Sequence, residues 1–234
     1  MKKPAAIITG ASSGLGKALS VKLSDKYFVY LISRNVERLK KTEDEILKKN
    51  NKCRIIVADI SEKDSIEYIS SKIKDKRNID LLVNNAGVAI FDNISNLSIN
   101  DWVKQINVNL TASFLMTKMV VDSLKAKEKG SIVFVNSVAG LNPYKNSSAY
   151  VASKYGLKGF ACSLREELRE HNIKVMSFYP GAINTSLWDG MDMDVFREEM
   201  MSVEDVSNII VDSINSPNNC VSEDVTIRRI KGDF

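Results

Sequence analysis

Short runs of apolar residues alternate along this chain with longer segments of helical character. Most of these runs are continuously apolar, as strands are when helices cover both faces of a parallel sheet. The predicted strands are Ala5–Thr9, Phe28–Ile32, Arg54–Ala58, Leu81–Asn84, Ser131–Asn136, Lys174–Tyr179 and Val225–Arg228. The predicted helices are Leu15–Lys26, Asn35–Lys49, Glu62–Lys76, Ile99–Lys127, Ala149–Glu170 and Val203–Asn215. This order predicts an α/β fold with a doubly wound parallel sheet of about seven strands and helices on both faces.

Nothing in the sequence divides this alternation into separate units. There is no linker rich in Pro or Gly, no internal repeat and no low-complexity stretch. The 234 residues, of which 44% are hydrophobic, are enough for one sizeable core. We therefore expect residues 1–234 to form a single domain.

Charge and cysteine content narrow the class of protein. The 33 Lys and Arg residues exceed the 29 Asp and Glu residues by four and are spread through the helical segments, so we expect no nucleic-acid partner. Cys53, Cys162 and Cys220 lack C-x-x-C spacing and are expected to be reduced and to bind no metal. The apolar run Ala5–Ile8 is too short for a signal peptide or a membrane span, which predicts a cytoplasmic protein without a membrane partner.

A turn with three glycines, Gly10, Gly14 and Gly16, connects the first strand to the first helix. Glycine lets the backbone turn sharply and approach a pyrophosphate, and the helix N-terminus offers free N–H groups to the phosphates. The spacing is one residue longer in its first gap than the commonest dinucleotide fingerprint, so a tight strand–helix connection without a ligand is the alternative. The predicted cofactor contacts in this turn are Gly10, Ser12, Ser13, Gly14, Leu15 and Gly16.

The end of the second strand predicts which dinucleotide binds. NAD-specific sites usually carry an acidic residue here, which accepts from the ribose 2′-hydroxyl. This chain has Ser33 and Arg34 instead, and a guanidinium pairs well with a 2′-phosphate, so NADP(H) is predicted to be preferred over NAD(H). Lys17 and Arg38 are candidate helpers; a plain surface role for Arg34 is the alternative.

The third strand is followed by Asp59 and Ile60. Asp59 is a candidate acceptor for the adenine amino group, and Ile60 lies beside it. An N-cap of the next helix is an equally good interpretation of Asp59.

Tyr150 and Lys154 lie four residues apart at the start of a predicted helix, and therefore on one face of it. An ammonium group near a phenol favours the phenolate and brings it into range for proton transfer. Tyr68 and Lys72 have the same spacing, so the spacing alone is weak evidence. Ser137 distinguishes the first pair: it follows a strand end thirteen residues before Tyr150, at the sheet edge where ligands bind.

Taken in order, these motifs closely resemble the short-chain dehydrogenase/reductase family over nearly the whole chain. The motifs are TGxxxGxG at Thr9–Gly16, NNAG at Asn84–Gly87, Asn109, Ser137, YxxxK at Tyr150–Lys154, and Pro180-Gly181. The resemblance implies a Rossmann-type fold and a dimer or tetramer of identical subunits.

The resemblance also implies roles for single residues. Tyr150 would exchange a proton with the substrate oxygen, Ser137 would hydrogen-bond that oxygen, and Lys154 would lower the pKa of Tyr150 and hold the nicotinamide ribose. Asn109 would support a water-linked proton relay at a helix irregularity; a simple helix-capping role is the alternative. Further cofactor contacts are implied for Asn84, Ala86, Gly87, Pro180, Gly181, Ile183 and Thr185.

Residues 185–203 are rich in Trp, Phe and Met and follow the predicted nicotinamide contacts. A movable lid over the substrate is one interpretation, and a subunit contact or an ordinary amphipathic helix is another. The loop residues Leu141, Asn142, Pro143 and Tyr144 are predicted to line the opposite wall. His171, the only histidine, is expected to interact with a helix C-terminus and not to take part in catalysis.

The sequence therefore predicts an enzyme that transfers a hydride between NADP(H) and a small carbonyl compound or alcohol. A catalytically silent NADP(H)-binding sensor or scaffold is the alternative from another class. An isomerase or dehydratase that uses the bound nucleotide transiently is a third hypothesis.

Overall fold

The computed structural model describes residues 3–62, 64–189 and 194–232. Seven strands form one sheet in the order β3-β2-β1-β4-β5-β6-β7, and every neighbouring pair is parallel. Their bounds are β1 Ala5–Thr9, β2 Phe28–Ser33, β3 Cys53–Val57, β4 Ile79–Asn84, β5 Gly130–Val135, β6 Ile173–Pro180 and β7 Asp224–Ile227. The predicted α/β fold with a doubly wound parallel sheet is confirmed.

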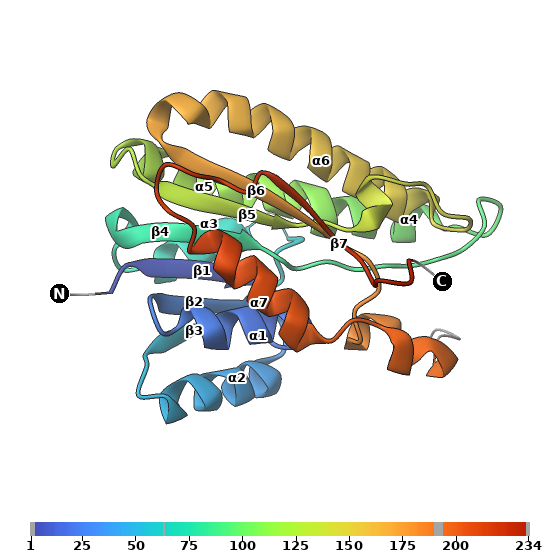
Figure 1. The fold of residues 1–234 in the computed structure, drawn as a ribbon, viewed down its shortest axis with the longest axis horizontal. Helices are drawn as coiled ribbons and strands as arrows, with labels where there is room; N and C mark the ends of the chain where they lie inside the picture. Colours follow the sequence, from blue (N-terminus) through green and yellow to red (C-terminus); the bar gives the residue numbers. More distant parts are fainter. Residues whose placement is uncertain (1–2, 63, 190–193, 233–234) are drawn as a thin grey trace.

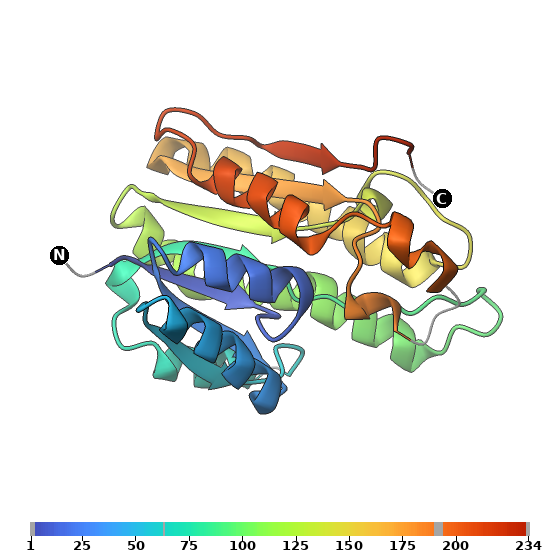
Figure 2. The ribbon, with the colours of Figure 1, turned by 60° about the horizontal axis from the view of Figure 1, so that its bottom comes forward.

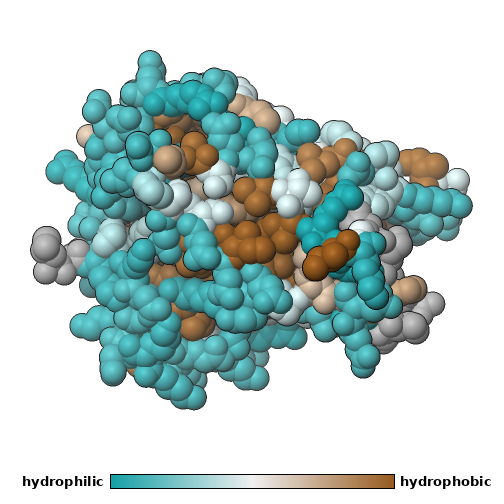
Figure 3. All heavy atoms as spheres, in the orientation of Figure 1, coloured by the Kyte–Doolittle hydropathy of each residue, from teal (hydrophilic) through white to brown (hydrophobic). Residues whose placement is uncertain are grey.

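Helices cover both faces of this sheet, as Figure 1 shows. One face carries α1 (Gly14–Leu23), α2 (Val36–Lys48) and α7 (Val203–Ile214). The other carries α3 (Ser65–Lys72), α4 (Ile99–Ile106), α5 (Ala112–Lys125) and α6 (Ser148–Leu168). Hydrophilic side chains cover most of the face seen in Figure 3, with hydrophobic ones in patches between them.

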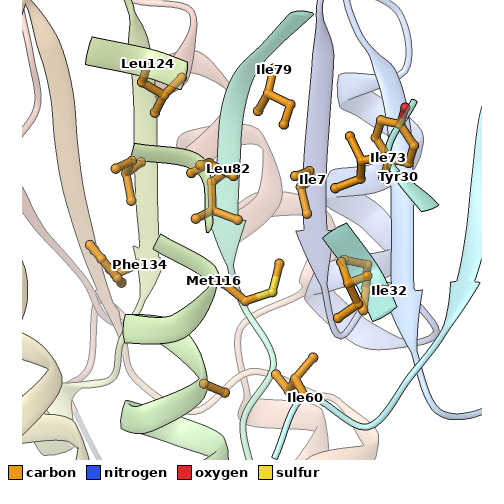
Figure 4. Close-up of a cluster of buried hydrophobic side chains, with 14 of the residues drawn as sticks. Ile7, Tyr30, Ile32, Ile60, Ile73, Ile79, Leu82, Met116, Leu124 and Phe134 are labelled. Carbon is orange, nitrogen blue, oxygen red and sulfur yellow. The ribbon is translucent and has the colours of Figure 1, made fainter. Parts of the chain in front are cut away.

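The alternation of side chains along the strands divides the core into two clusters. In β1, Ile7 faces α5 and α6, whereas Ile8 faces α1, α2 and α7. Figure 4 shows part of the first cluster, with Ile7 and Leu82 of the sheet near Met116 of α5. The central strands are buried on both faces, which explains why their sequences are continuously apolar, whereas the edge strands β3 and β7 are partly exposed.

The chain order reverses between β1 and β4, which are neighbours in the sheet. The strands that follow β1 extend the sheet to one side, and those that follow β4 extend it to the other. In Figure 2 all arrowheads point toward the same edge, where the short 3₁₀ helices Ser186–Trp188 and Asp194–Glu199 also lie. A crevice at this edge is where open α/β sheets bind ligands.

Two predicted helices differ from the structure. The predicted helix Ile99–Lys127 is divided by a π-helical turn at Asn107–Thr111, so the helix irregularity expected around Asn109 is present. The predicted helix Glu62–Lys76 is shorter, because Ile73 takes an extended conformation and turns into the core.

Candidate active site

A cavity of about 920 Å³ opens at the carboxyl ends of the strands. Its walls come from the glycine turn, from the ends of β2 to β6, from the start of α6 and from the segment after β6. Of the residues predicted to be catalytic or to contact the cofactor directly, all but Asn84 and Asn109 line it. They are Gly10, Ser12, Ser13, Gly14, Leu15, Gly16, Ser33, Arg34, Asp59, Ile60, Ala86, Gly87, Ser137, Tyr150, Lys154, Pro180, Gly181, Ile183 and Thr185.

The glycine turn has a backbone that other residues rarely adopt. Gly10 has a φ of +68° and Gly14 a φ of +50°. A Cβ on Gly16 would lie 2.2 Å from the Gly10 carbonyl oxygen and 2.3 Å from Nδ2 of Asn85. Ser13 makes no side-chain cap bond, so the first N–H groups of α1 remain available to a ligand in the cavity. These features match a phosphate-binding turn.

The end of β2 places positive charge at one end of the cavity. Arg34 is 63% exposed, and its Nη1 lies 3.3 Å from Oδ2 of Asp59. Arg38 also lines the cavity, whereas Lys17 does not and pairs instead with Glu45 at 2.7 Å. Of the two candidate helpers, only Arg38 therefore lines the cavity.

Asp59 is not the N-cap of the next helix, because α3 begins only at Ser65. Its Oδ1 accepts hydrogen bonds from the backbone N–H and the hydroxyl of Ser61, at 3.0 and 2.7 Å. Partial burial opposes ionisation, but these bonds and the Arg34 charge hold the pKa of Asp59 below its usual value.

Ser137, Tyr150 and Lys154 lie together on the wall of the cavity. Tyr150 is in the first turn of α6, and its side chain is hydrogen-bonded to Ser137, which directly follows Asn136 at the end of β5. Burial raises the pKa of Tyr150, and the Ser137 hydrogen bond partly opposes this. Lys154 Nζ donates to the Val135 carbonyl at 3.1 Å, and burial lowers the pKa of Lys154 to about 8.

The Tyr68/Lys72 pair has the same spacing but a different environment. Tyr68 is 46% exposed on α3, against 9% for Tyr150. In both pairs the ammonium lies above the ring, 5.0 Å from the centroid of Tyr68 and 5.7 Å from that of Tyr150. The four-residue spacing within a helix therefore places an ammonium over a phenol ring in both pairs, but only the pair Tyr150 and Lys154 lines the cavity.

Asn109 and Asn84 lie behind the cavity wall. The Asn109 side chain accepts from the Val88 N–H at 2.8 Å and donates to the Val88 carbonyl and to Ser153 Oγ, both at 2.9 Å. Asn84 is buried, donates to Thr117 on α5 and does not line the cavity. Asn85 lines the cavity instead, because successive side chains of a strand point to opposite faces.

Sequence reasoning missed Phe91, which lies in the segment between β4 and α4. Its ring is edge-on to Tyr150, with centroids 5.7 Å apart, and lies 6.1 Å from the ring of Trp188. The run of apolar residues directly after Gly87 could have indicated that this segment lines the cavity. Of the loop residues predicted for the opposite wall, only Tyr144 lines this cavity; Leu141, Asn142 and Pro143 do not.

Backbone pairing and hydrogen bonds connect the two ends of segment 185–203 in its described parts. Ile183 pairs with Met201 in a short parallel bridge, and Arg197 donates to the Thr185 carbonyl at 3.2 Å and to Asp189 at 2.8 Å. Leu187 and Trp188 line the cavity. Met191 and Met193, which belong to the segment interpreted as a lid, a subunit contact or an amphipathic helix, lie outside the described residues.

Two further features concern the described residues as a whole. They contain no group of three or more His, Cys, Asp or Glu side chains that could hold a metal ion. None of their helices combines the length and apolar character needed to cross a membrane.

Comparison with known proteins identifies relatives along most of the chain. Residues 4–195 match the sequence profile of the short chain dehydrogenase family. Sepiapterin reductase of Chlorobaculum tepidum is 30% identical over 237 residues, which cover 97% of each chain. NADP-dependent 3-hydroxy acid dehydrogenase of Schizosaccharomyces pombe is 32% identical, over 94% of this chain and 90% of that protein. A crystal structure of a metagenomic short-chain oxidoreductase in complex with NADP aligns with a TM-score of 0.85 and 30% identity, over 97% of each chain.

The close contact at Gly16 predicts that Gly16→Ala destabilises the protein by about 1–3 kcal/mol, because the added methyl group overlaps the Gly10 carbonyl. Gly159→Ala is the matched control: Gly159 is also helical, it is exposed, and a Cβ there would meet nothing within 4 Å. Alanine should raise helix propensity at that position. Thermal unfolding of both variants tests this, and equal melting temperatures would contradict the role assigned to the turn.

Proposed function

This chain belongs to the short chain dehydrogenase family, and from that premise we propose that it is an NADP(H)-dependent oxidoreductase acting on a carbonyl group or on a primary or secondary alcohol. The observation that carries the proposal is the group formed by Ser137 and the buried side chains of Tyr150 and Lys154 on the wall of the cavity of about 920 Å³. Reaction in the two directions corresponds to a carbonyl reductase and an alcohol dehydrogenase.

The shape of the turn supports a bound dinucleotide. Gly10, Gly14 and Gly16 keep the backbone free of Cβ atoms where the pyrophosphate would lie, next to the N-terminus of α1. Arg34 and Arg38 would bind a 2′-phosphate, which favours NADP(H) over NAD(H). When bound, the nicotinamide would supply or accept the hydride. The NADP complex of a structure 30% identical to this chain supports the same preference.

The proton chemistry is assigned to Tyr150. An ordinary phenol carries its proton at neutral pH and can donate it to a carbonyl oxygen, and burial raises the pKa of Tyr150 further. Ser137 is bonded to the phenol and would hydrogen-bond the same substrate oxygen. Lys154, with a pKa of about 8, is mostly charged at pH 7, so it would stabilise the phenolate and bind the ribose hydroxyls.

Asn109 is assigned a supporting role. Its amide holds Val88 and reaches Ser153, whose hydroxyl donates to the Tyr150 carbonyl at 2.7 Å. The π-helical turn at Asn107–Thr111 supports the proposal that a water-linked proton relay passes here, because such a turn disrupts the regular backbone bonding of the helix.

Three proposals concern the organisation of the protein. The continuous sheet supports one cofactor-binding and catalytic domain over residues 1–234. The position of Leu187 and Trp188 on the cavity wall supports a substrate lid as one role for segment 185–203. Ile99, Val103 and Phe114 leave apolar surface exposed on α4 and α5, which supports a homodimer or homotetramer.

The role of Tyr150 predicts that Tyr150→Phe lowers turnover by about a hundred- to ten-thousandfold while NADPH binding is nearly unchanged, because only the hydroxyl is lost. Tyr68→Phe is the matched control and should leave turnover unchanged. Steady-state NADPH oxidation and calorimetric binding measure the two quantities. Full activity in Tyr150→Phe would refute the assignment, and tight NADPH binding without oxidation of any carbonyl in a broad panel would indicate a sensor or scaffold.

The burial of Tyr150 and Lys154 also predicts how the activity depends on pH. The kcat/KM for carbonyl reduction should be level near neutral pH and fall above about pH 8, where Lys154 loses its charge in the free enzyme. Alcohol oxidation should increase as pH rises, because it requires Tyr150 without its proton. In Lys154→Arg the cation persists, so the decline should move to higher pH, whereas Lys72→Arg should leave it in place. A reduction profile that is flat to alkaline pH would contradict this.

The position of Arg34 predicts that Arg34→Asp weakens NADPH binding by about ten- to a hundredfold and NADH binding far less, because a charge-assisted bond to the 2′-phosphate is lost. Lys17→Asp is the control, since Lys17 pairs with Glu45 outside the cavity. Isothermal titration with both cofactors tests this. Equal weakening for NADPH and NADH would exclude Arg34 as the selective residue.

A further inference from the structure

Two buried amide side chains hold the segment between β4 and α4. Gln105 accepts from the Ile90 N–H at 3.0 Å and donates to the Ile90 carbonyl at 3.2 Å. Asn109, four residues later, exchanges the same two bonds with Val88. Both amides are essentially inaccessible to water. They bind alternate residues of the segment as a neighbouring strand would.

This pairing fixes the backbone next to Phe91, whose ring reaches into the cavity. Phe91 is 38% exposed although it lies beside the buried Tyr150. Its ring stands at 86° to the phenol and at 31° to the indole of Trp188. Two aromatic rings thus line the cavity directly next to the proposed proton donor.

Trp188 is also held by polar contacts behind its ring. Its Nε1 donates to the Ile183 carbonyl at 3.0 Å, so the polar part of the indole is satisfied within the protein. The N–H of Leu187 lies 3.4 Å from the hydroxyl of Thr185. The indole is therefore fixed in orientation and can offer its ring surface to a substrate.

We propose that Phe91 and Trp188 determine substrate specificity by favouring carbonyl compounds that carry a planar aromatic or conjugated group next to the reacting carbon, with Gln105 as the positioning residue for Phe91. The inference rests on the proposed function for the identity of the reacting group. A planar group makes offset or edge-on contacts with both rings, whereas a puckered saturated ring of the same size cannot. The centroids are 6.1 Å apart, less than the roughly 7 Å needed to insert a ring between two others, so the substrate lies along the pair.

The activity test compares acetophenone with cyclohexyl methyl ketone, which have the same number of carbon atoms. In Phe91→Leu and in Trp188→Leu, the ratio of the two kcat/KM values should fall about three- to tenfold relative to the wild type. Phe91→Tyr should retain the ratio. Tyr68→Leu is the control, because Tyr68 is an exposed aromatic residue of α3 that does not line the cavity. An unchanged ratio in both leucine variants would overturn the proposal.

Gln105 is tested by two variants of similar size. Gln105→Met removes both bonds to Ile90 and should lower the acetophenone preference as Phe91→Leu does. Gln105→Glu keeps the acceptor for the Ile90 N–H and should restore part of the preference. Loss of stability alone would reduce turnover of both ketones equally, so a preference that stays constant in both variants would overturn the positioning role.

A binding test separates this inference from the proposed reaction. The chain has two tryptophans, Trp102 and Trp188, so Trp102→Phe leaves Trp188 as the only fluorescent indole. With NADP⁺ present, benzamide should change the Trp188 fluorescence at lower concentration than cyclohexanecarboxamide. An equal response would overturn the inference even if ketones are reduced. If the wild type reduces neither ketone, the proposed function fails, and the benzamide titration still decides whether the pair recognises planar groups.

Discussion

The site depends on how closely the backbone of the first turn packs against itself and against β4. The Gly10 carbonyl lies so near Gly16 that no side chain fits between them. Asn85, beneath the turn, donates to the Thr9 carbonyl at 2.9 Å, and the Thr9 hydroxyl accepts from the backbone N–H groups of Asn85 and Ala86. These contacts join the ends of β1 and β4, the two strands between which the chain order reverses. The connection between the ends of these two strands, where the crevice opens, is therefore made by glycine, asparagine and threonine and not by charged side chains.

Burial sets the electrostatics of the site, and it acts in opposite directions on its two titratable groups. Water is excluded from both Tyr150 and Lys154, which raises the pKa of the phenol and lowers that of the ammonium. Each shift favours the neutral form, so without a ligand the pair does not form a phenolate–ammonium ion pair at neutral pH. The hydrogen bonds to Ser137 and to the Val135 carbonyl hold the two groups in place. A positive charge near the phenol would act against the effect of burial, because it favours the phenolate.

The sequence predicts much of this arrangement, because strands, turns and helical spacing are local properties. The seven strands, the glycine turn and the position of Ser137 after β5 all follow from short patterns. Where the predicted site residues and the structure differ, the difference lies in the direction in which a side chain points. Asn84 and Asn85 are adjacent and chemically identical. They differ in the direction of their side chains at the end of β4: Asn84 points into the core, and Asn85 lines the cavity. Lys17 lies on α1 but outside the cavity, where it pairs with Glu45 of α2. Phe91 and Gln105 belong to contacts between distant segments, which no local periodicity reveals.

The geometry of the Gln105 and Asn109 amides explains why a helix can replace a strand at this position. Four residues along a helix rise about 6 Å, and two residues of extended chain span about 6.7 Å. Amides four apart on a helix therefore match alternate residues of an extended segment, here Val88 and Ile90. The segment that follows β4 gains ladder-like bonds without a neighbouring strand, and its side chains remain free to line the cavity. Asn109 thereby connects two parts of the site: one side of its amide holds the segment that carries Phe91, and the other reaches Ser153 beneath Tyr150. A change at Asn109 would act on substrate recognition and on proton transfer together, whereas a change at Gln105 would act on recognition alone.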